Sequence, residues 1–74
     1  MDIAFLEGLA EILELDKADV QPDLHLSSTN WDSLAIVSTI ALADEVFGVM
    51  LDGKALSKCT SVADIEALIA KQRS

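Results

Sequence analysis

Ser33 is the residue of this chain best suited to chemistry, because it stands where a polar loop gives way to a long apolar segment. The pattern of that segment predicts a helix, which places the Ser33 hydroxyl at the positive end of a helix dipole. Asp32 adds a carboxylate directly beside it. Free N–H groups at a helix amino end stabilise anions, so this position suits a serine that carries a phosphate ester.

A catalytic role for Ser33 has little support in the rest of the sequence. A nucleophilic serine needs a base within reach, and the only histidine, His25, lies in a loop with no evident partner to fix its tautomer. Asp16, Asp19 and Asp23 lack the alternating spacing and the closing glutamate of a calcium loop. We therefore expect neither an enzyme nor a metal site.

The simplest alternative is that Ser33 is a helix N-cap, a role that stabilises a helix by about 1 kcal/mol. Asn30 and Asp32 compete with it for the same backbone N–H groups. We expect that Asp32 caps the helix while the Ser33 side chain projects outward.

The spacing of apolar residues predicts an all-α fold, a small bundle of three main helices plus one short helix. Apolar residues recur every three or four positions over residues 2–15 and 33–47. The third main helix follows Ser61, its expected N-cap. Residues 54–58 are expected to form one or two turns. The length of 74 residues suits a single domain over residues 1–74.

Residues 16–32 form a long loop between the first two main helices, and a loop of this length is often functional. Val20, Leu24 and Leu26 are spaced as anchors that could hold it on the core. The alternative is a crossover that lets the two helices run in the same direction.

The predicted helix over residues 33–47 is apolar nearly all round. On a helical wheel Ile36, Ile40 and Phe47 share the face expected to meet the core. The opposite face, expected to point outward and contact partners, carries Ala35, Ser38, Leu42, Glu45 and Val46.

Charge and composition limit the classes of partner. Thirteen acidic and five basic residues give a formal charge of −8, which repels nucleic acid and anionic membranes. Proteins with basic patches are the expected partners, although the charge could also serve only solubility. The single cysteine, Cys59, is expected to be a small buried hydrophobe. Charges within residues 1–14 argue against a signal peptide or membrane span, so a cytoplasmic location is expected.

Three stretches occur in an informative order along the chain. They are Val20-Gln21-Pro22-Asp23-Leu24, then Trp31-Asp32-Ser33-Leu34 followed by Val37, Ile40, Glu45, Phe47 and Gly48, and finally Thr60-Ser61-Val62-Ala63-Asp64-Ile65. They resemble the loop before the modification site, the modification site with the second helix, and the start of the last helix of the acyl carrier proteins.

This resemblance implies that a phosphopantetheinyl transferase, using coenzyme A and magnesium, attaches 4′-phosphopantetheine to Ser33. The arm ends in a thiol that holds an acyl group as a thioester, and the carrier presents this group to acyl-loading and acyl-transfer enzymes without catalysing a reaction. Asp32 matches the family's acidic residue before the serine and would position the site for the transferase. Leu34 matches the apolar residue after it and would contact partners.

Two departures from the family pattern bear on specificity. Trp31 stands where members often have glycine, and it could cover the start of the arm, contact a partner or fold over the core. Fatty-acid carriers have a strongly acidic second helix, whereas the predicted outward face here is mostly apolar. This difference favours a dedicated lipid, polyketide or surface-glycan pathway over general fatty acid biosynthesis.

Several alternatives stay open at the level of sequence. An aminoacyl or peptidyl carrier, including the D-alanyl type, would use the same arm, and an unmodified helical adaptor would need none. A monomer is expected. Residues that could line a space for cargo, or simply pack the core, are Ile36, Ile40, Phe47, Val62 and Ile65.

Overall fold

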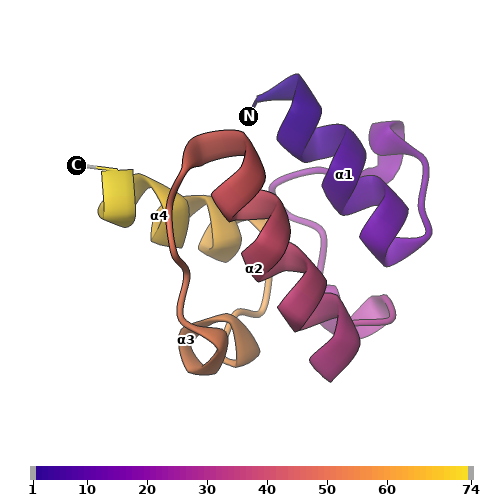
Figure 1. The fold of residues 1–74 in the computed structure, drawn as a ribbon. Helices are drawn as coiled ribbons and strands as arrows, with labels where there is room; N and C mark the ends of the chain where they lie inside the picture. The colour runs from indigo at the N-terminus through magenta and orange to yellow at the C-terminus, as the bar shows by residue number, and fades with distance from the viewer. Residues whose placement is uncertain (1, 74) are drawn as a thin grey trace.

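The computed structural model describes residues 2–73 and contains no strand in that range. The all-α prediction of three main helices plus one short helix is confirmed (Figure 1). The elements in chain order are α1 (Ile3–Leu13), the 3-10 turns η1 (Lys17–Asp19) and η2 (Leu26–Ser28), α2 (Ser33–Phe47), α3 (Gly53–Ser57) and α4 (Val62–Arg73).

Helices α1 and α2 run antiparallel (Figure 1), so the alternative interpretation of the loop, a crossover between helices of the same direction, is wrong. The rings of Phe5, near the start of α1, and Phe47, at the end of α2, lie 5.4 Å apart between centroids. In the middle of the pair, a Cβ on Gly8 would lie only 2.5 Å from Leu42 Cδ1. The missing side chain of Gly8 therefore lets the two helices approach closely.

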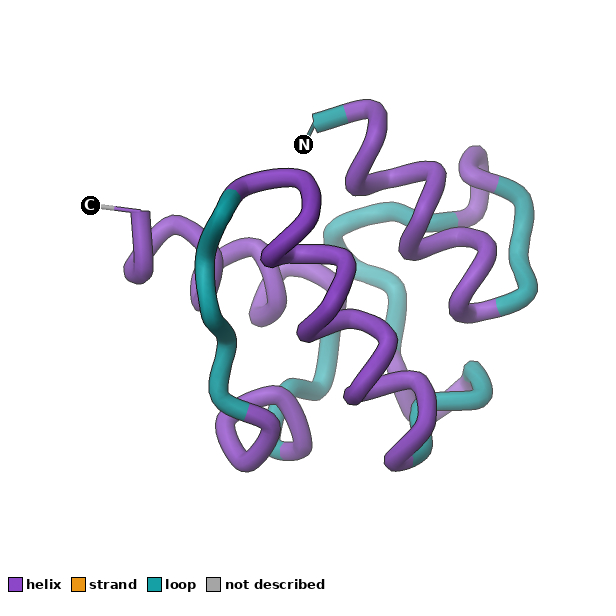
Figure 2. The backbone as a smooth tube through the Cα atoms, in the orientation of Figure 1, coloured by secondary structure: helices purple, strands orange, loops and turns teal. Residues whose placement is uncertain are grey.

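The long connection between α1 and α2 is held on the core, as its apolar residues predicted. Val20 and Leu26 are buried. The Leu26 N–H donates to the Thr60 carbonyl at 2.9 Å, and the Val62 N–H donates to the Leu24 carbonyl at 3.2 Å. The connection is thus fastened to the start of α4, and Figure 2 shows its loops passing behind the helices.

The start of α4 is stabilised by a carboxylate that reaches back over the preceding turn. Asp64 Oδ2 accepts hydrogen bonds from the Thr60 N–H at 2.9 Å, the Thr60 hydroxyl at 2.9 Å and the Ser61 N–H at 3.2 Å. These bonds, led by that from the Thr60 backbone, lower the pKa of Asp64 below its ordinary value. This is the carboxylate half of a capping box, and it satisfies backbone N–H groups that lack a helical partner, whereas no cap by the Ser61 hydroxyl, the expected N-cap, is recorded.

The orientation of α2 differs from the prediction. Its buried residues are Ala35, Thr39 and Ala43, so the expectation that Ala35 faces outward is wrong. Leu42 and Val46 are half-buried and pack against the core. Small side chains spaced four residues apart let α2 approach its neighbours closely, and this packing turns other side chains toward solvent. The residues that are exposed instead are Leu34, Val37 and Ala41.

Candidate functional site

Ser33 is the first residue of α2 and its side chain is exposed. The residue before it does the capping, because Asp32 Oδ1 accepts a hydrogen bond from the Ala35 N–H at 2.9 Å. Asp32 has the extended backbone of an N-cap, with φ −122° and ψ −173°. The predicted division of roles is therefore confirmed: Asp32 caps the helix, and the exposed Ser33 side chain does not take part in capping.

Asn30, the third residue able to cap α2, is used elsewhere. Its amide donates to the Ile12 carbonyl at 3.2 Å and to Glu14 Oε2 at 3.1 Å. These bonds fasten the segment before α2 to the carboxyl end of α1. The backbone that carries Ser33 is thus held on both sides while the hydroxyl stays open to solvent.

Trp31 folds over the core, which was one of the roles considered for it. Its indole N–H donates to the Leu56 carbonyl at 3.3 Å, linking the start of α2 to α3. The side chain is half-buried and packs against the core cluster. The indole, held by this packing and by its hydrogen bond, forms a wall near Ser33 in the chain.

A hollow of about 530 Å³ lies on one side of Trp31. The segment around η2 forms one wall, and residues from the end of α3 to the start of α4 form the other. The lining residues are His25, Leu26, Ser27, Thr29, Trp31, Ser57, Cys59 and Thr60. Sequence reasoning missed this hollow, because its walls are more than twenty-five residues apart along the chain.

Cys59 contributes a thiol to this hollow and is half-buried. Its Sγ donates to the Ala55 carbonyl at 3.6 Å. Burial, with a smaller contribution from the negative charge of Asp64, raises the pKa of Cys59 above the ordinary value of 9.0. The thiol is therefore protonated near neutral pH and is a weak nucleophile.

The other predicted partner-contact residues lie in two settings. Ser38, Leu42 and Glu45 line a groove of about 360 Å³ between α1 and α2, together with Glu11. Val46 lines a different hollow. The apolar side chains most exposed on α2 are Leu34, at 74%, and Val37, at 61%, and the wheel had not placed Val37 on the outward face.

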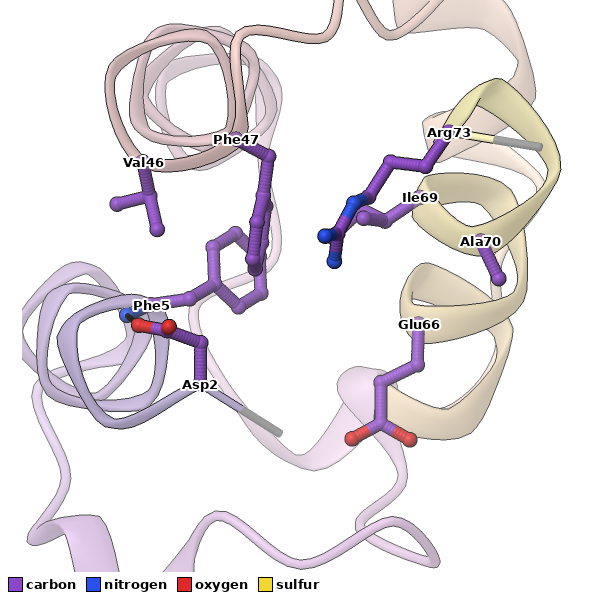
Figure 3. Close-up of a pocket in the computed structure, with 8 residues that line it drawn as sticks. All are labelled: Asp2, Phe5, Val46, Phe47, Glu66, Ile69, Ala70 and Arg73. Carbon is purple, nitrogen blue, oxygen red and sulfur yellow. Dashed lines mark hydrogen bonds between the residues drawn. The ribbon is translucent and has the colours of Figure 1, made fainter.

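Val46 belongs to a hollow of about 620 Å³ where the amino end of α1 meets the carboxyl ends of α2 and α4 (Figure 3). In this hollow the Arg73 guanidinium lies 4.9 Å from the centroid of the Phe47 ring. Fifteen helical residues place Phe47 about 20 Å along α2 from Ser33. This hollow is therefore remote from the candidate attachment residue.

The remaining residues named for a cargo space are core residues or border α3. Val62 and Ile65 are fully buried. Ile36 and Ile40 are half-buried and lie against Gly53, within 3.8 Å and 3.4 Å of the position that a Cβ there would occupy.

Within residues 2–73, no group of three or more His, Cys, Asp or Glu side chains is arranged to hold a metal ion. None of the helices described there has the length and apolar character needed to cross a bilayer.

A family model described as the phosphopantetheine attachment site matches residues 4–69, which is most of the chain. No match was found among curated proteins or among solved structures. Domains of this family are generally non-catalytic carriers that bear covalent 4′-phosphopantetheine and interact with a phosphopantetheinyl transferase and with partner enzymes. The chain belongs to the phosphopantetheine attachment site family, the family of the acyl carrier proteins.

Proposed function

We propose that Ser33 is the residue that bears the phosphopantetheine arm and that the arm carries acyl groups as thioesters. The observation that supports this most is the division of roles at the start of α2. Asp32 caps the helix through Ala35, and Ser33 is exposed at the first helical position. Attachment there would leave the capping bond of α2 in place.

The residues at this position fit a phosphodiester. The first N–H groups of a helix have no carbonyl partner within it, and the helix dipole is positive at this end. Both effects favour the negative charge that is added on modification. In the attachment step the Ser33 oxygen would form a bond to phosphorus of coenzyme A, and adenosine 3′,5′-bisphosphate would leave. The serine proton would pass to a base of the transferase.

The face of α2 that continues from Ser33 is the proposed docking surface for partner enzymes. It consists of Leu34, Val37 and Ala41, with the exposed carboxylates of Asp44 and Glu45 at its far end. Exposed apolar side chains on a small domain indicate an interaction surface. Ser38 and Trp31 border this face, and Ala35 is excluded from it by burial.

The apolar character of this docking surface supports a dedicated carrier in a lipid, polyketide or surface-glycan pathway. Charge steers association and apolar contact supplies binding energy, so partners of this chain would present an apolar patch with a basic rim. We expect a monomer that works in the cytoplasm, and an acyl rather than an aminoacyl cargo. If housekeeping fatty-acid synthase enzymes turned over the loaded protein at normal rates, the dedicated pathway would be excluded.

The attachment is tested by the intact mass of the protein after incubation with coenzyme A, magnesium and a phosphopantetheinyl transferase. We expect a gain of one phosphopantetheine unit that is lost in Ser33→Ala and kept in Ser38→Ala, a matched change on the same helix. A gain that persists in Ser33→Ala would show that another residue is modified.

A further inference from the structure

We infer that the hollow between α1, α2 and α4 binds a zwitterionic amino acid with an apolar side chain (Figure 3). The hollow encloses about 620 Å³, within the range of roughly 300–1,000 Å³ that is typical of small-molecule sites. This site does not depend on the attachment at Ser33, because the two lie at opposite ends of α2. Its lining holds charges of both signs with apolar side chains between them, and this combination selects the ligand class.

One wall of the hollow is a stripe of α4 with opposite charges at its two ends. The stripe consists of Glu66, Ile69, Ala70 and Arg73, which share one face of the helix because residues three and four apart are neighbours there. Glu66 and Arg73 are seven residues apart, which separates their backbones by about 10 Å along the axis. No ion pair joins them within the part of the chain that the structure describes. A ligand that carries both charges can span this gap.

The guanidinium of Arg73 is positioned to bind the carboxylate of the ligand. Its carbon lies 4.9 Å from the centroid of the Phe47 ring, so one flat face of the guanidinium is covered. That ring is itself held by Phe5, at 5.4 Å between centroids. Stacking leaves the N–H groups at the edge of the guanidinium available, and their geometry matches a carboxylate in a bidentate pair. Within residues 2–73 this guanidinium makes no hydrogen bond or ion pair that would compete.

Two carboxylates are available for the ammonium group of the ligand. Glu66 is half-buried and has no hydrogen bond or ion pair among the described residues, and Asp2 stands across the hollow from it (Figure 3). Asp2 Oδ1 accepts hydrogen bonds from the Ala4 and Phe5 N–H groups at 2.9 Å and 3.4 Å, which leaves its second oxygen for a ligand. A ligand with only a carboxylate would face two negative charges, and a ligand with only an ammonium group would face Arg73. The lining therefore favours a zwitterion.

The apolar part of the hollow fits the side chain of the ligand. Phe5 and Ile69 are buried and form its floor. Val46 and Phe47 are half-buried and form the wall opposite α4 (Figure 3). An aromatic or branched side chain placed between this wall and α4 would bury apolar surface on both partners. The ligand is thus oriented by its two charges and held by its side chain.

The site is tested with L-phenylalanine and with phenylpropionate and phenethylamine, which share its ring but carry only the negative or only the positive charge. Each compound is titrated into the unmodified full chain, and backbone amide shifts are followed by two-dimensional NMR. We expect saturable shifts within residues 46–48 and 66–73 with phenylalanine, and binding at least about tenfold weaker with either analogue, because each lacks one charge-assisted contact. Equal affinity for phenylpropionate would indicate an anion site, and equal affinity for phenethylamine a cation site. Either result, or no saturable shift with phenylalanine, would overturn the proposal.

Two variants with matched controls locate the site. Arg73→Leu and Glu66→Gln should each weaken phenylalanine binding at least about tenfold while the circular dichroism spectrum stays that of the natural protein. Lys58→Leu and Glu11→Gln remove the same charges at exposed positions outside the hollow and should bind phenylalanine as the natural protein does. Full affinity in either Arg73→Leu or Glu66→Gln would refute recognition of a zwitterion here. All four variants should still be modified at Ser33, so the outcome for this site is separate from that for the attachment.

Discussion

Substitutions of Asp32 separate the capping role of this carboxylate from its charge. The carboxylate accepts one hydrogen bond from the Ala35 N–H at 2.9 Å and lies at the positive end of α2. Loss of an N-cap costs about 1 kcal/mol, and loss of a favourable charge at this position costs about 0.3–1 kcal/mol. Asp32→Ala should therefore lower the free energy of unfolding by about 1–2 kcal/mol, whereas Asp32→Asn keeps the cap and should lose less than about 1 kcal/mol.

Urea unfolding of apo protein measures these changes, with Ser33→Ala as the matched control. Its side chain is exposed and the cap is elsewhere, so its stability should change by no more than about 0.5 kcal/mol. Melting temperatures should follow at about 4–8 °C for each kcal/mol in a domain of this size. If Ser33→Ala were the destabilising change and Asp32→Ala the neutral one, Ser33 would be the cap and the assigned division of roles would be refuted.

The same variants test the role of Asp32 in modification. If its charge positions the transferase, Asp32→Asn will be modified more slowly than the natural protein while the fold is kept. Equal initial rates of mass gain for the two proteins would limit Asp32 to capping.

Two further predictions concern close packing and the thiol. Gly8→Ala should lower the free energy of unfolding by about 1 kcal/mol, because overpacking against Leu42 outweighs the helix propensity gained. This loss should vanish in a Leu42→Ala background. Urea unfolding that shows Gly8→Ala to be more stable than the natural protein would contradict this prediction. Cys59 should react with iodoacetamide more slowly than a free thiol at pH 8–9, since its pKa is raised. Because the pKa of Cys59 is higher in the folded state, its contribution to stability is fully present below the ordinary thiol pKa and is lost as the pH rises through the pKa of the folded state. The rate of alkylation as a function of pH measures this pKa, and a value at or below 9.0 would refute the assignment.

The three main helices were predictable because each has a strong local signal. The short helix has a weaker one, and α3 spans Gly53–Ser57 rather than residues 54–58. The spacing of apolar and acidic residues predicted α1, although the helix begins at Ile3 and ends at Leu13 rather than spanning residues 2–15. Glu14 follows with φ 59°, a left-handed backbone that ends the helix and that no local pattern announces. Ile3, the first residue of α1, is 67% exposed although it is apolar.

The face of α2 was not predictable, because its apolar residues surround the helix and give no clear direction. Which face of α2 is buried depends on how closely its side chains can pack against the neighbouring elements. Ala35, Thr39 and Ala43 are small enough for close contact, and the Thr39 hydroxyl is satisfied inside the core by the Ala35 carbonyl at 2.8 Å. The bond from Trp31 to Leu56 joins residues far apart in the chain, so no local signal predicts it.

On the proposed function, the choice of buried face decides where partner enzymes dock relative to the attachment residue. Burying the small side chains leaves Leu34 and Val37 exposed on the same rigid helix as Ser33. Leu34 adjoins the attachment residue, and Val37 lies about one turn, or about 5 Å, further along the axis. A partner that docks on these two side chains is therefore placed at a fixed distance from the base of the arm.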